Sequence, residues 1–396
     1  MNMNEQMKES EESILHTYNR FPVVFEKGQG CYLYDSEGKE YLDFAAGIAV
    51  NSLGYHYPGY DEALKDQIDK LMHISNLYYN EPIIEAGAKL VKASKMSKAF
   101  FTNSGTEAIE GALKAAKKYA YVRDGHADHE IIAMNHSFHG RSIGALSVTG
   151  TVHYREPFEP LMGGVKFADF NNLESVKAQI TDKTCAIITE VVQGEGGIYP
   201  AKKEFLEGLR QICDEKDIML IFDEIQCGMG RTGHYFAWQA YGVQPDIMTS
   251  AKALGCGVPV GAFVLSEKAA KASLEPGDHG TTYGGNPFVC AAVSKVFDIY
   301  KNDKIIEHVQ EMTPYLEQKL DEIVAKHECA ATRRGMGFMQ GIVIQGRPVG
   351  EVVKAALAKG LLVISAGSDV LRIVPPLVIT KEHIDKMAAI LDECME

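Results

Sequence analysis

Short apolar runs separated by polar turns mark the first part of the chain. The runs Val23–Phe25, Cys31–Tyr34 and Tyr41–Phe44 are rich in aromatic and branched residues, and the turn sequence Asp35–Gly38 separates the last two. Apolar runs on both sides of such a turn are typical of strands that fold back on each other. We therefore predict a β-hairpin within residues 21–50.

From about residue 81 the chain alternates between two patterns. Segments of helical composition or spacing cover 83–93, 105–121 and 203–214, and short apolar runs typical of buried strands cover 99–102, 131–134, 185–189, 218–222, 246–250 and 261–265. Strands that alternate with helices predict a mainly parallel α/β sheet.

After Pro287 the pattern changes again. Two helices are predicted over 288–300 and 304–327, two strands over 339–344 and 361–364, and a final helix from about Lys381. This order is typical of a smaller α+β domain. We therefore expect an N-terminal segment (1–50) that packs with the small domain, a large ligand-binding domain (51–287) and a C-terminal small domain (288–396).

Charge and composition exclude several classes of protein. The content of 46% hydrophobic and 23% charged residues is ordinary for a globular protein. A formal net charge of −13 repels polyanions, so we expect neither a nucleic-acid partner nor an anionic membrane. The N-terminal residues 1–15 are polar and acidic, unlike a signal peptide, and no apolar run reaches the ~18 residues that span a bilayer. These observations predict a cytoplasmic protein.

The cysteine spacing gives no metal-binding or disulfide pattern. The eight cysteines are scattered along the chain, and no Cys-x-x-Cys pair occurs. We therefore expect reduced, mostly buried thiols and no metal site.

A candidate phosphate site lies between a predicted strand and an Ala-rich helix, at Asn103–Glu107. Ser104 or Thr106 can cap the helix, and Gly105 permits a close approach. The free N–H groups and the dipole at a helix start favour phosphate binding. A plain helix cap with no ligand is the alternative for this segment alone.

Two carboxylates, Asp223 and Glu224, follow the apolar run 218–222 directly. Acids at the carboxyl end of a buried strand lie where α/β proteins bind ligands. A Walker-B acid would need a G-x-x-x-x-G-K-[ST] loop, which the chain lacks. The other interpretation is a carboxylate that pairs with a protonated heterocyclic nitrogen, such as that of pyridoxal phosphate.

Lys252 ends the predicted strand 246–250 and is followed by Gly255, Gly257 and Gly261. A lysine that is desolvated at such an edge has a lowered pKa and can form a Schiff base. A solvated surface lysine is the alternative. The three glycines do not have the G-x-G-x-x-G spacing, so a dinucleotide site is not indicated.

Two further segments offer ligand-binding groups. Phe138–Arg141 brings an aromatic face for a planar ring close to a guanidinium for a carboxylate. The loop Gln193–Gly197 carries one carboxylate, Glu195, among glycines, and a simple glycine turn is its alternative.

Taken together, these segments resemble the class III aminotransferases, the ornithine-type branch of the fold-type I pyridoxal-phosphate enzymes. The matching pieces appear in the family's order over nearly the whole chain: Ser104–Ala108, Phe138–Arg141, Gln193–Gly196, Asp223–Gln226, Ser250–Gly255, Thr281–Pro287 and Leu371–Pro376. The resemblance implies an α/β fold with a large, mainly parallel sheet domain and a smaller α+β domain.

For the cofactor, pyridoxal 5'-phosphate, the resemblance implies a role for eight residues. Lys252 would carry it as a Schiff base and move the proton of the reaction. Asp223 would pair with the pyridinium nitrogen. The others would bond the ring hydroxyl, cover the two ring faces and hold the phosphate, the last of them from the partner subunit of a homodimer: Gln226, Phe138, Ile225, Gly105, Thr106 and Thr282.

For the substrates, the resemblance implies two carboxylate sites. Arg141 would bind the α-carboxylate of an amino donor, with Thr281 of the partner nearby. Arg372 would bind the α-carboxylate of 2-oxoglutarate or glutamate, and Glu195 would be its gate. The implied reaction moves the δ-amino group of N-acetylornithine to 2-oxoglutarate, and ornithine, succinylornithine and 4-aminobutyrate stay open as donors.

Two positions depart from the family pattern, and the sequence does not favour two other classes of protein. Tyr55 stands where a histidine is usual, and Cys256 where glycine is common, which leaves the exact donor open. A nucleotide-binding enzyme would need a phosphate-loop or dinucleotide fingerprint, and neither occurs. A catalytically silent relative would not need both Lys252 and Asp223.

Overall fold

The N-terminal part forms a helix and a small meander of strands. The structure is a computed structural model that describes residues 2–396. Helix α1 (Met3–Ser13) precedes three antiparallel strands, β1 (Phe25–Gln29), β2 (Tyr32–Asp35) and β3 (Glu40–Asp43). Asp35 shapes the predicted turn, because its carboxylate accepts from the backbone N–H groups of Glu37 and Lys39 at 3.0 and 2.9 Å. The predicted hairpin is confirmed, although β1 begins at Phe25 and not at Val23.

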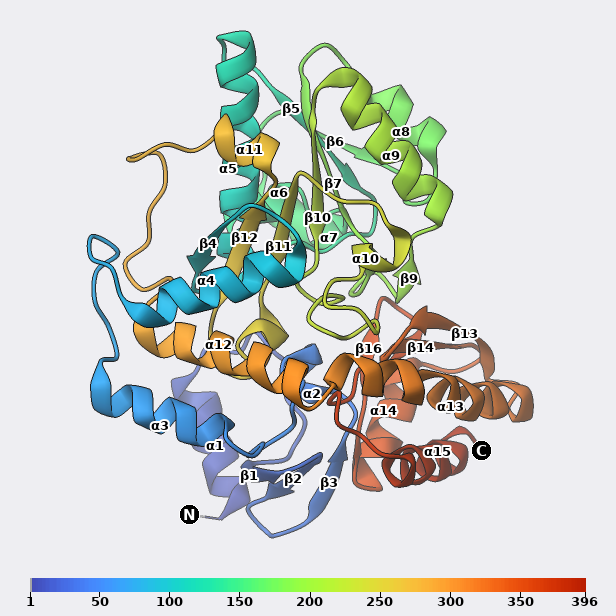
Figure 1. Ribbon diagram of the computed structural model, residues 1–396. Coiled ribbons are helices and arrows are strands. Elements are labelled where there is room, and N and C mark those ends of the chain that lie inside the picture. Colours follow the sequence, from blue (N-terminus) through green and yellow to red (C-terminus); the bar gives the residue numbers. More distant parts are fainter. Residues whose placement is uncertain (1) are drawn as a thin grey trace.

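A seven-stranded sheet forms the centre of the molecule (Figure 1), in the order β4-β12-β11-β10-β7-β5-β6. Only β12 is antiparallel to its neighbours, so the prediction of a mainly parallel sheet is confirmed. The edge strand β6 has no counterpart among the predicted strands. The strands are β4 (Lys98–Thr102), β5 (Glu130–Met134), β6 (Val165–Ala168), β7 (Thr184–Glu190), β10 (Met219–Asp223), β11 (Ile247–Ser250) and β12 (Gly261–Leu265).

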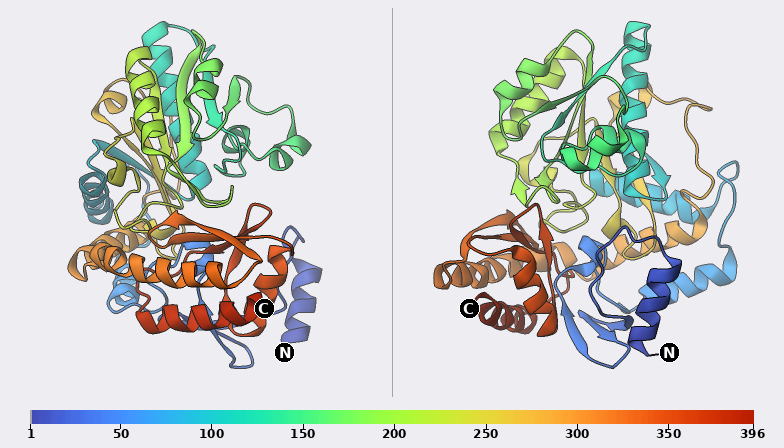
Figure 2. Two further views of the ribbon diagram at one scale, coloured as in Figure 1. Left: turned by 90° about the vertical axis from the view of Figure 1, so that its right-hand side faces the viewer. Right: turned by 180° about the vertical axis from the view of Figure 1, so that it is seen from behind.

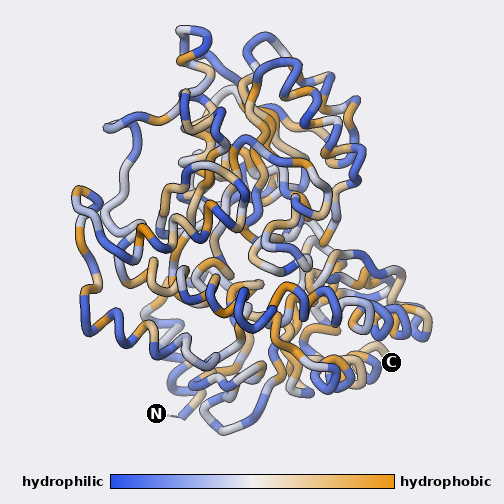
Figure 3. The backbone as a smooth tube through the Cα atoms, in the orientation of Figure 1, coloured by the Kyte–Doolittle hydropathy of each residue, from blue (hydrophilic) through white to orange (hydrophobic). Residues whose placement is uncertain are grey.

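Helices cover both faces of this sheet, which explains why its inner strands are continuous apolar runs. The long helix α5 (Gly105–Asp124) packs on one face, whereas α8 (Leu173–Gln179) and α9 (Lys203–Lys216) lie on the other (Figures 1 and 2). Figure 3 shows hydrophobic segments gathered along the central strands. Shorter elements connect these layers: α2 (Ala46–Ala49), α6 (Ile143–Ser147), α7 (Val152–Arg155), α10 (Trp238–Tyr241), α11 (Glu267–Lys271) and the ribbon β8 (Val192–Gln193)–β9 (Tyr199–Pro200).

The C-terminal part contains a second, four-stranded sheet, β13-β14-β17-β16, flanked by helices. The predicted strand 361–364 is in fact two short strands, because β15 pairs with β3 and β16 pairs with β17 of the other sheet. The elements are α13 (Ile305–Lys326), β13 (Ala330–Met336), β14 (Met339–Ile344), α14 (Val349–Ala358), β15 (Leu361–Leu362), β16 (Ile364–Ala366), β17 (Val370–Ile373) and α15 (Lys381–Met395).

Helix α12 (Pro287–Asn302) lies between the two parts. It packs against α3 (Tyr60–Lys70) and α4 (Glu81–Ser94), and it also contacts α13. The parallel pairing of β3 with β15 joins the N-terminal segment to the C-terminal part. The division of the chain at residues 50 and 287 stays a prediction. Among the described helices, none has the length and apolar content that a membrane span requires.

Candidate active site

A cavity of about 520 Å³ lies at the carboxyl edge of the large sheet. The carboxyl ends of β7, β10 and β11 meet there, as expected for ligand sites of parallel sheets. Eight of the predicted site residues line the cavity together: Gly105, Thr106, Phe138, Arg141, Asp223, Ile225, Gln226 and Lys252. They come from distant parts of the sequence, and the sheet brings them to one place.

The two consecutive carboxylates after β10 have different surroundings. Asp223 accepts from the Nδ1 of His139 at 2.8 Å, from the backbone N–H of Ile225 at 3.0 Å and from a threonine hydroxyl. Glu224 turns away and accepts from the backbone N–H groups of Ala237 and Trp238, both at 2.8 Å. Burial raises the pKa of Glu224 to about 7. Only Asp223 belongs to the cavity.

The surroundings of Asp223 fit a cationic heterocycle. Its side chain is 4% exposed, and among residues 2–396 it pairs with no lysine or arginine. A buried carboxylate is unfavourable unless a cation or several donors compensate it. The protonated ring nitrogen of pyridoxal phosphate supplies such a cation, so this end of the cavity fits the group.

Lys252 also lines the cavity, two residues after the end of β11. Its backbone has a left-handed φ of 47°, which is unfavourable for a residue with a Cβ. Burial lowers the pKa of Lys252 to about 8. The lowered pKa increases the fraction of neutral amine, which is the form that attacks an aldehyde.

The start of α5 fits a phosphate group. Ser104 caps the helix, because its hydroxyl accepts from the N–H of Glu107 at 3.3 Å. This cap leaves the first two N–H groups, those of Gly105 and Thr106, without an intrahelical partner. A Cβ on Gly105 would lie 2.9 Å from the side chain of Ile225, so only glycine keeps this approach open. The cap and the phosphate site predicted from the sequence are therefore compatible.

Glu195 and Arg372 form a partly buried ion pair beside the cavity. The two nitrogens of the Arg372 guanidinium donate to the two carboxylate oxygens at 2.5 and 3.2 Å, and Arg372 is 3% exposed. Burial is the largest influence on the pKa of Glu195 and would raise it, but the charge and hydrogen bonds of Arg372, the charge of Lys252 and the hydrogen bond from Gln226 together lower it. Gln226 connects this pair to the cavity, since it accepts from Arg372 at 3.1 Å and donates to Glu195 at 3.4 Å.

Arg141 is exposed at the mouth of the same cavity. Its guanidinium carbon lies 4.0 Å from the centre of the Tyr154 ring and 5.5 Å from that of Phe138. Within the described part of the chain it has no carboxylate partner. The charge of Arg141 is therefore available to an anionic ligand.

Two predicted residues lie outside the cavity of this chain. Thr281 accepts from the amide of Asn103 at 3.3 Å, so it contacts the cavity wall without lining it. Thr282 is exposed and does not line the cavity. The expected contribution of both residues to a partner subunit's site stays a prediction.

The sequence interpretation assigned no role to His139 and Glu190. Glu190 ends β7 in register with Asp223, and its oxygens accept from the N–H groups of Phe138 and Gly194 at 3.3 and 3.1 Å. Burial, together with the charge of Asp223, raises the pKa of Glu190 well above its usual value. The sequence did contain a signal for Glu190, because this acid follows the apolar run 185–189 just as Asp223 follows the run 218–222.

The two departures from the family pattern serve the packing around the N-terminal segment. The Tyr55 hydroxyl donates to Asp43 at 2.8 Å, and its ring occupies the space where a Cβ on Gly28 would lie. The Cys256 thiol accepts from the N–H of Leu53 at 3.3 Å. Neither side chain lines the cavity.

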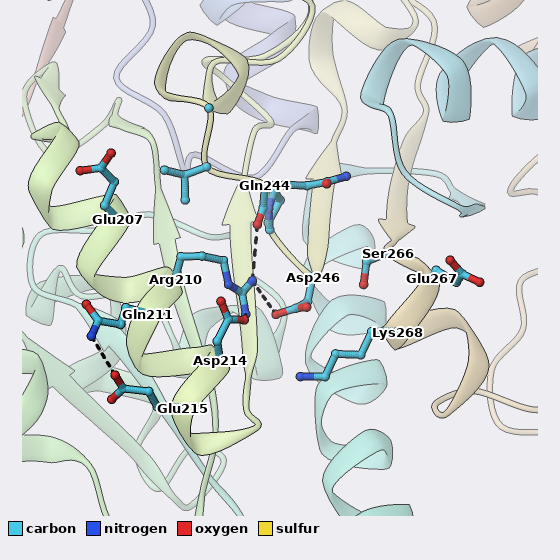
Figure 4. Close-up of a pocket in the computed structure, with 13 residues that line it drawn as sticks. Glu207, Arg210, Gln211, Asp214, Glu215, Gln244, Asp246, Ser266, Glu267 and Lys268 are labelled. Atoms are coloured by element: carbon cyan, nitrogen blue, oxygen red, sulfur yellow. Dashed lines mark hydrogen bonds and ion pairs between the residues drawn. The ribbon is translucent and has the colours of Figure 1, made fainter.

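A second cavity, of about 730 Å³, lies at the opposite, amino-terminal edge of the sheet (Figure 4). Arg210 from α9 points to Asp246, which precedes β11, and the pair is 2.8 Å apart. Asp246 also accepts from the N–H of Leu220 at 2.9 Å, so these charges secure the starts of the strands. This edge contains none of the predicted site residues.

The fold and the site define an enzyme that uses pyridoxal phosphate. The family model for class III aminotransferases, described as "Aminotransferase class-III", matches residues 14–395, and the chain belongs to this family. It is a pyridoxal-phosphate-dependent aminotransferase of fold type I, and pyridoxal 5'-phosphate is its cofactor.

Similar proteins cover nearly the whole chain. An acetylornithine aminotransferase of Clostridium acetobutylicum is 47% identical over 98% of this chain and 100% of its own length. A succinylornithine transaminase of Yersinia pseudotuberculosis is 44% identical over 94% of this chain and 92% of its own. The solved structure of the ornithine aminotransferase from Toxoplasma gondii superposes with a TM-score of 0.95, at 28% identity, over 100% of this chain and 94% of that one.

Proposed function

We propose that this enzyme moves the δ-amino group of N-acetylornithine to 2-oxoglutarate, giving N-acetylglutamate semialdehyde and glutamate. The observation that carries the proposal is the closed pair between Glu195 and Arg372, together with a cavity-lining Arg141 that has no carboxylate partner within residues 2–396. The similarity to acetylornithine aminotransferases at 46–48% identity supports the same donor.

The two arginines match the two substrates of this reaction. A δ-amine has no carboxylate beside the reacting carbon, so a bare cation at Arg372 would favour α-amino groups. Glu195 neutralises that cation while the donor reacts. 2-Oxoglutarate brings a carboxylate next to its reacting carbon, and it would replace Glu195 on Arg372. The distant α-carboxylate of the donor would bind Arg141.

The chain's own groups account for the proton movements. When bound, pyridoxal phosphate supplies an electron sink for the substrate carbon beside the reacting nitrogen. Lys252 Nζ removes a proton from that carbon and returns it at the other end of the 1,3-shift. Asp223 would accept a hydrogen bond from the protonated ring nitrogen, and His139 orients Asp223 through its Nδ1. The lowered pKa of Lys252 suits a group that accepts and returns a proton near neutral pH.

The remaining cavity residues would position the cofactor. Phe138 and Ile225 would cover the two faces of the ring, and Gln226 would bond its hydroxyl. The backbone N–H groups of Gly105 and Thr106 would hold the phosphate. The supporting observation is that all five line one cavity, with the helix start at one end and Asp223 at the other.

A homodimer would complete the site, because Thr281 and Thr282 lie outside the cavity of their own chain. Exposed apolar side chains near this segment support an interface: Leu77, Tyr79 and Tyr283 are 87%, 95% and 61% exposed. Sedimentation at assay concentration tests this proposal, and a fully active monomer would contradict it. The cytoplasmic location stays a prediction from the N-terminal sequence.

Succinylornithine is a specific alternative donor, since a transaminase of that name is 44% identical. Ornithine and 4-aminobutyrate remain further alternatives. These donors differ in the part that is remote from the reacting amine, and not in the chemistry that Lys252 performs. Comparing kcat/KM for all four donors with 2-oxoglutarate decides between them, and we expect N-acetylornithine to be preferred.

The cofactor assignment has a direct test at Lys252. The purified protein should be yellow, and borohydride should attach the cofactor to a peptide that contains Lys252. Lys252→Ala should still bind the cofactor but lose at least about a thousandfold in turnover, because both the covalent link and the proton carrier are removed. A protein that stays colourless after incubation with pyridoxal phosphate would contradict the assignment.

A further inference from the structure

We propose that Glu110 and Ser142 are positioning residues that join the donor-binding arginine to the phosphate end of the site. Ser142 directly follows Arg141, and Glu110 lies on the second turn of α5. The Ser142 hydroxyl lies 2.5 Å from a carboxylate oxygen of Glu110 and 2.7 Å from the hydroxyl of Thr106. The three side chains form one hydrogen-bonded chain between α5 and the loop that carries Arg141.

The Glu110 carboxylate determines which hydroxyl group donates in each of these hydrogen bonds. An ionised carboxylate only accepts hydrogen bonds, so Ser142 donates its hydroxyl proton to Glu110. Thr106 must then donate its own hydroxyl proton to Ser142. The oxygen of Thr106 also accepts from the backbone N–H of Ser142 at 3.2 Å. The hydroxyl proton of Thr106 is therefore already donated to Ser142, and Thr106 would offer a phosphate its backbone N–H alone.

Glu110 also anchors the short helix that follows Arg141. Helix α6 lies beside α5 and has no side-chain cap of its own. The carboxylate oxygen that binds Ser142 also accepts from the N–H of Ala145 at 3.1 Å, so Glu110 provides the cap from α5. One carboxylate thus holds both the residue after Arg141 and the first turn of α6.

Two glycines show how closely this loop approaches α5. A Cβ on Gly140 would lie 2.4 Å from the hydroxyl oxygen of Thr106, and a Cβ on Gly144 would lie 2.1 Å from Glu110. Arg141 lies between these two glycines in the sequence, so its backbone position depends on how the loop packs against Thr106 and Glu110. We infer that breaking the hydrogen bonds among Thr106, Ser142 and Glu110 shifts Arg141. Donor binding should then weaken more than acceptor binding at the buried Arg372.

The first experiment measures the Kd of pyridoxal phosphate for the cofactor-free protein by equilibrium dialysis, which involves no substrate. Thr106→Val should change this Kd by less than about fivefold, because the hydroxyl proton is donated to Ser142 and is not free for the phosphate. Thr106→Ser, which keeps a hydroxyl, is the control. A larger loss, toward the roughly tenfold or more expected when a hydrogen bond to a charged group is removed, would overturn the inference.

The second experiment rests on the proposed role of Arg141 and measures the two half-reactions separately. Ser142→Ala and Glu110→Gln should each raise the donor concentration for half-maximal rate about fivefold or more, and leave 2-oxoglutarate within about twofold. The double variant should need no higher donor concentration than the more impaired single variant, because both substitutions break the same set of hydrogen bonds. Equal losses for both substrates, or additive losses, would overturn the inference.

The two experiments separate this inference from the proposed function. If the parent enzyme does not use N-acetylornithine, the half-reactions are measured with the donor that it does use, and only the proposed function fails. If Glu110→Gln loses its cooperative thermal unfolding, Ser142→Ala alone decides the second experiment. Rescue of donor binding by Ser142→Thr, which restores a hydroxyl, is expected only if the chain of hydrogen bonds is responsible.

Discussion

The two arginines of the site show how environment gives one residue type two roles. Arg372 is 3% exposed, and its guanidinium is held by Glu195, Gln226 and the carbonyl of Ser365. Arg141 is exposed, and its guanidinium lies over the rings of Tyr154 and Phe138. Arg372 is neutralised by Glu195, whereas Arg141 has no carboxylate partner in the described part of the chain.

Under the proposed function, this difference would let one cavity serve two substrates in turn. Breaking a buried ion pair by removing one partner leaves an uncompensated charge, so the pair with Arg372 is exchanged only for another carboxylate. A surface cation stacked on a ring keeps its charge in contact with water and can bind an anion without displacing a partner. If both proposed roles hold, Arg141 would select the donor and Arg372 the acceptor.

The largest effect is expected from removing the available cation. Arg141→Ala should weaken N-acetylornithine by roughly 2–4 kcal/mol, because a bidentate charged bond is lost, and change 2-oxoglutarate little. Half-reaction kinetics measure the two substrates separately. Arg155→Ala is a matched control, since that guanidinium lies over Phe167 and outside the cavity. Equal losses for both substrates would mean that Arg141 has a structural role.

A smaller change is expected when Arg372 loses its carboxylate partner, Glu195. Glu195→Ala should slow the N-acetylornithine half-reaction and leave the 2-oxoglutarate half-reaction unchanged or faster. It should also raise the reactivity toward glutamate and other α-amino acids by roughly tenfold, since their carboxylates find Arg372 without a competitor. Stopped-flow absorbance resolves the half-reactions, and Glu204→Ala, at an exposed site on α9, is the control. If both half-reactions slow equally, Glu195 is not a gate.

The two arginines should also differ in their effect on the pH dependence of cofactor binding, because Arg372 and its partner Glu195 influence the pKa of Lys252. Neutral Lys252 is the reactive form, so the rate at which the cofactor-free protein binds pyridoxal phosphate should rise with pH and level off above about pH 8. Glu195 raises the pKa of Lys252 and Arg372 lowers it, so Glu195→Gln should move the midpoint to lower pH. Arg141→Ala should leave the midpoint in place. A midpoint near the usual lysine value of 10.5 would contradict the buried environment.

The smallest effect concerns the ring beneath Arg141. Tyr154→Leu removes the stacked face and keeps an apolar side chain, so donor binding should weaken by about 0.5–1 kcal/mol, a few-fold in KM. Tyr154→Phe keeps the face and should behave like the parent enzyme. If both substitutions weaken the donor equally, the hydroxyl of Tyr154, and not the stacking, is responsible.

Much of the large domain could be predicted because its signals are local. Each buried strand is a continuous apolar run, and each polar residue that follows such a run lies at the same edge when the strands are parallel. For this reason Asp223 and Lys252 could be placed in one site before the fold was known. Sequence spacing could not tell Asp223 from Glu224, because the choice depends on the backbone N–H groups of Ala237 and Trp238.

The sequence by itself determined the class of fold, the cofactor and the set of chemical groups, since apolar periodicity and short motifs depend on neighbouring residues. Only the tertiary structure decided which groups touch. It split the predicted strand 361–364 between two sheets, and it closed Glu195 onto Arg372 across 177 positions. It also brought Glu110, Ser142 and Thr106 into one chain of hydrogen bonds. Such contacts depend on how helices and loops pack, and packing is a property of the whole molecule that no local pattern specifies.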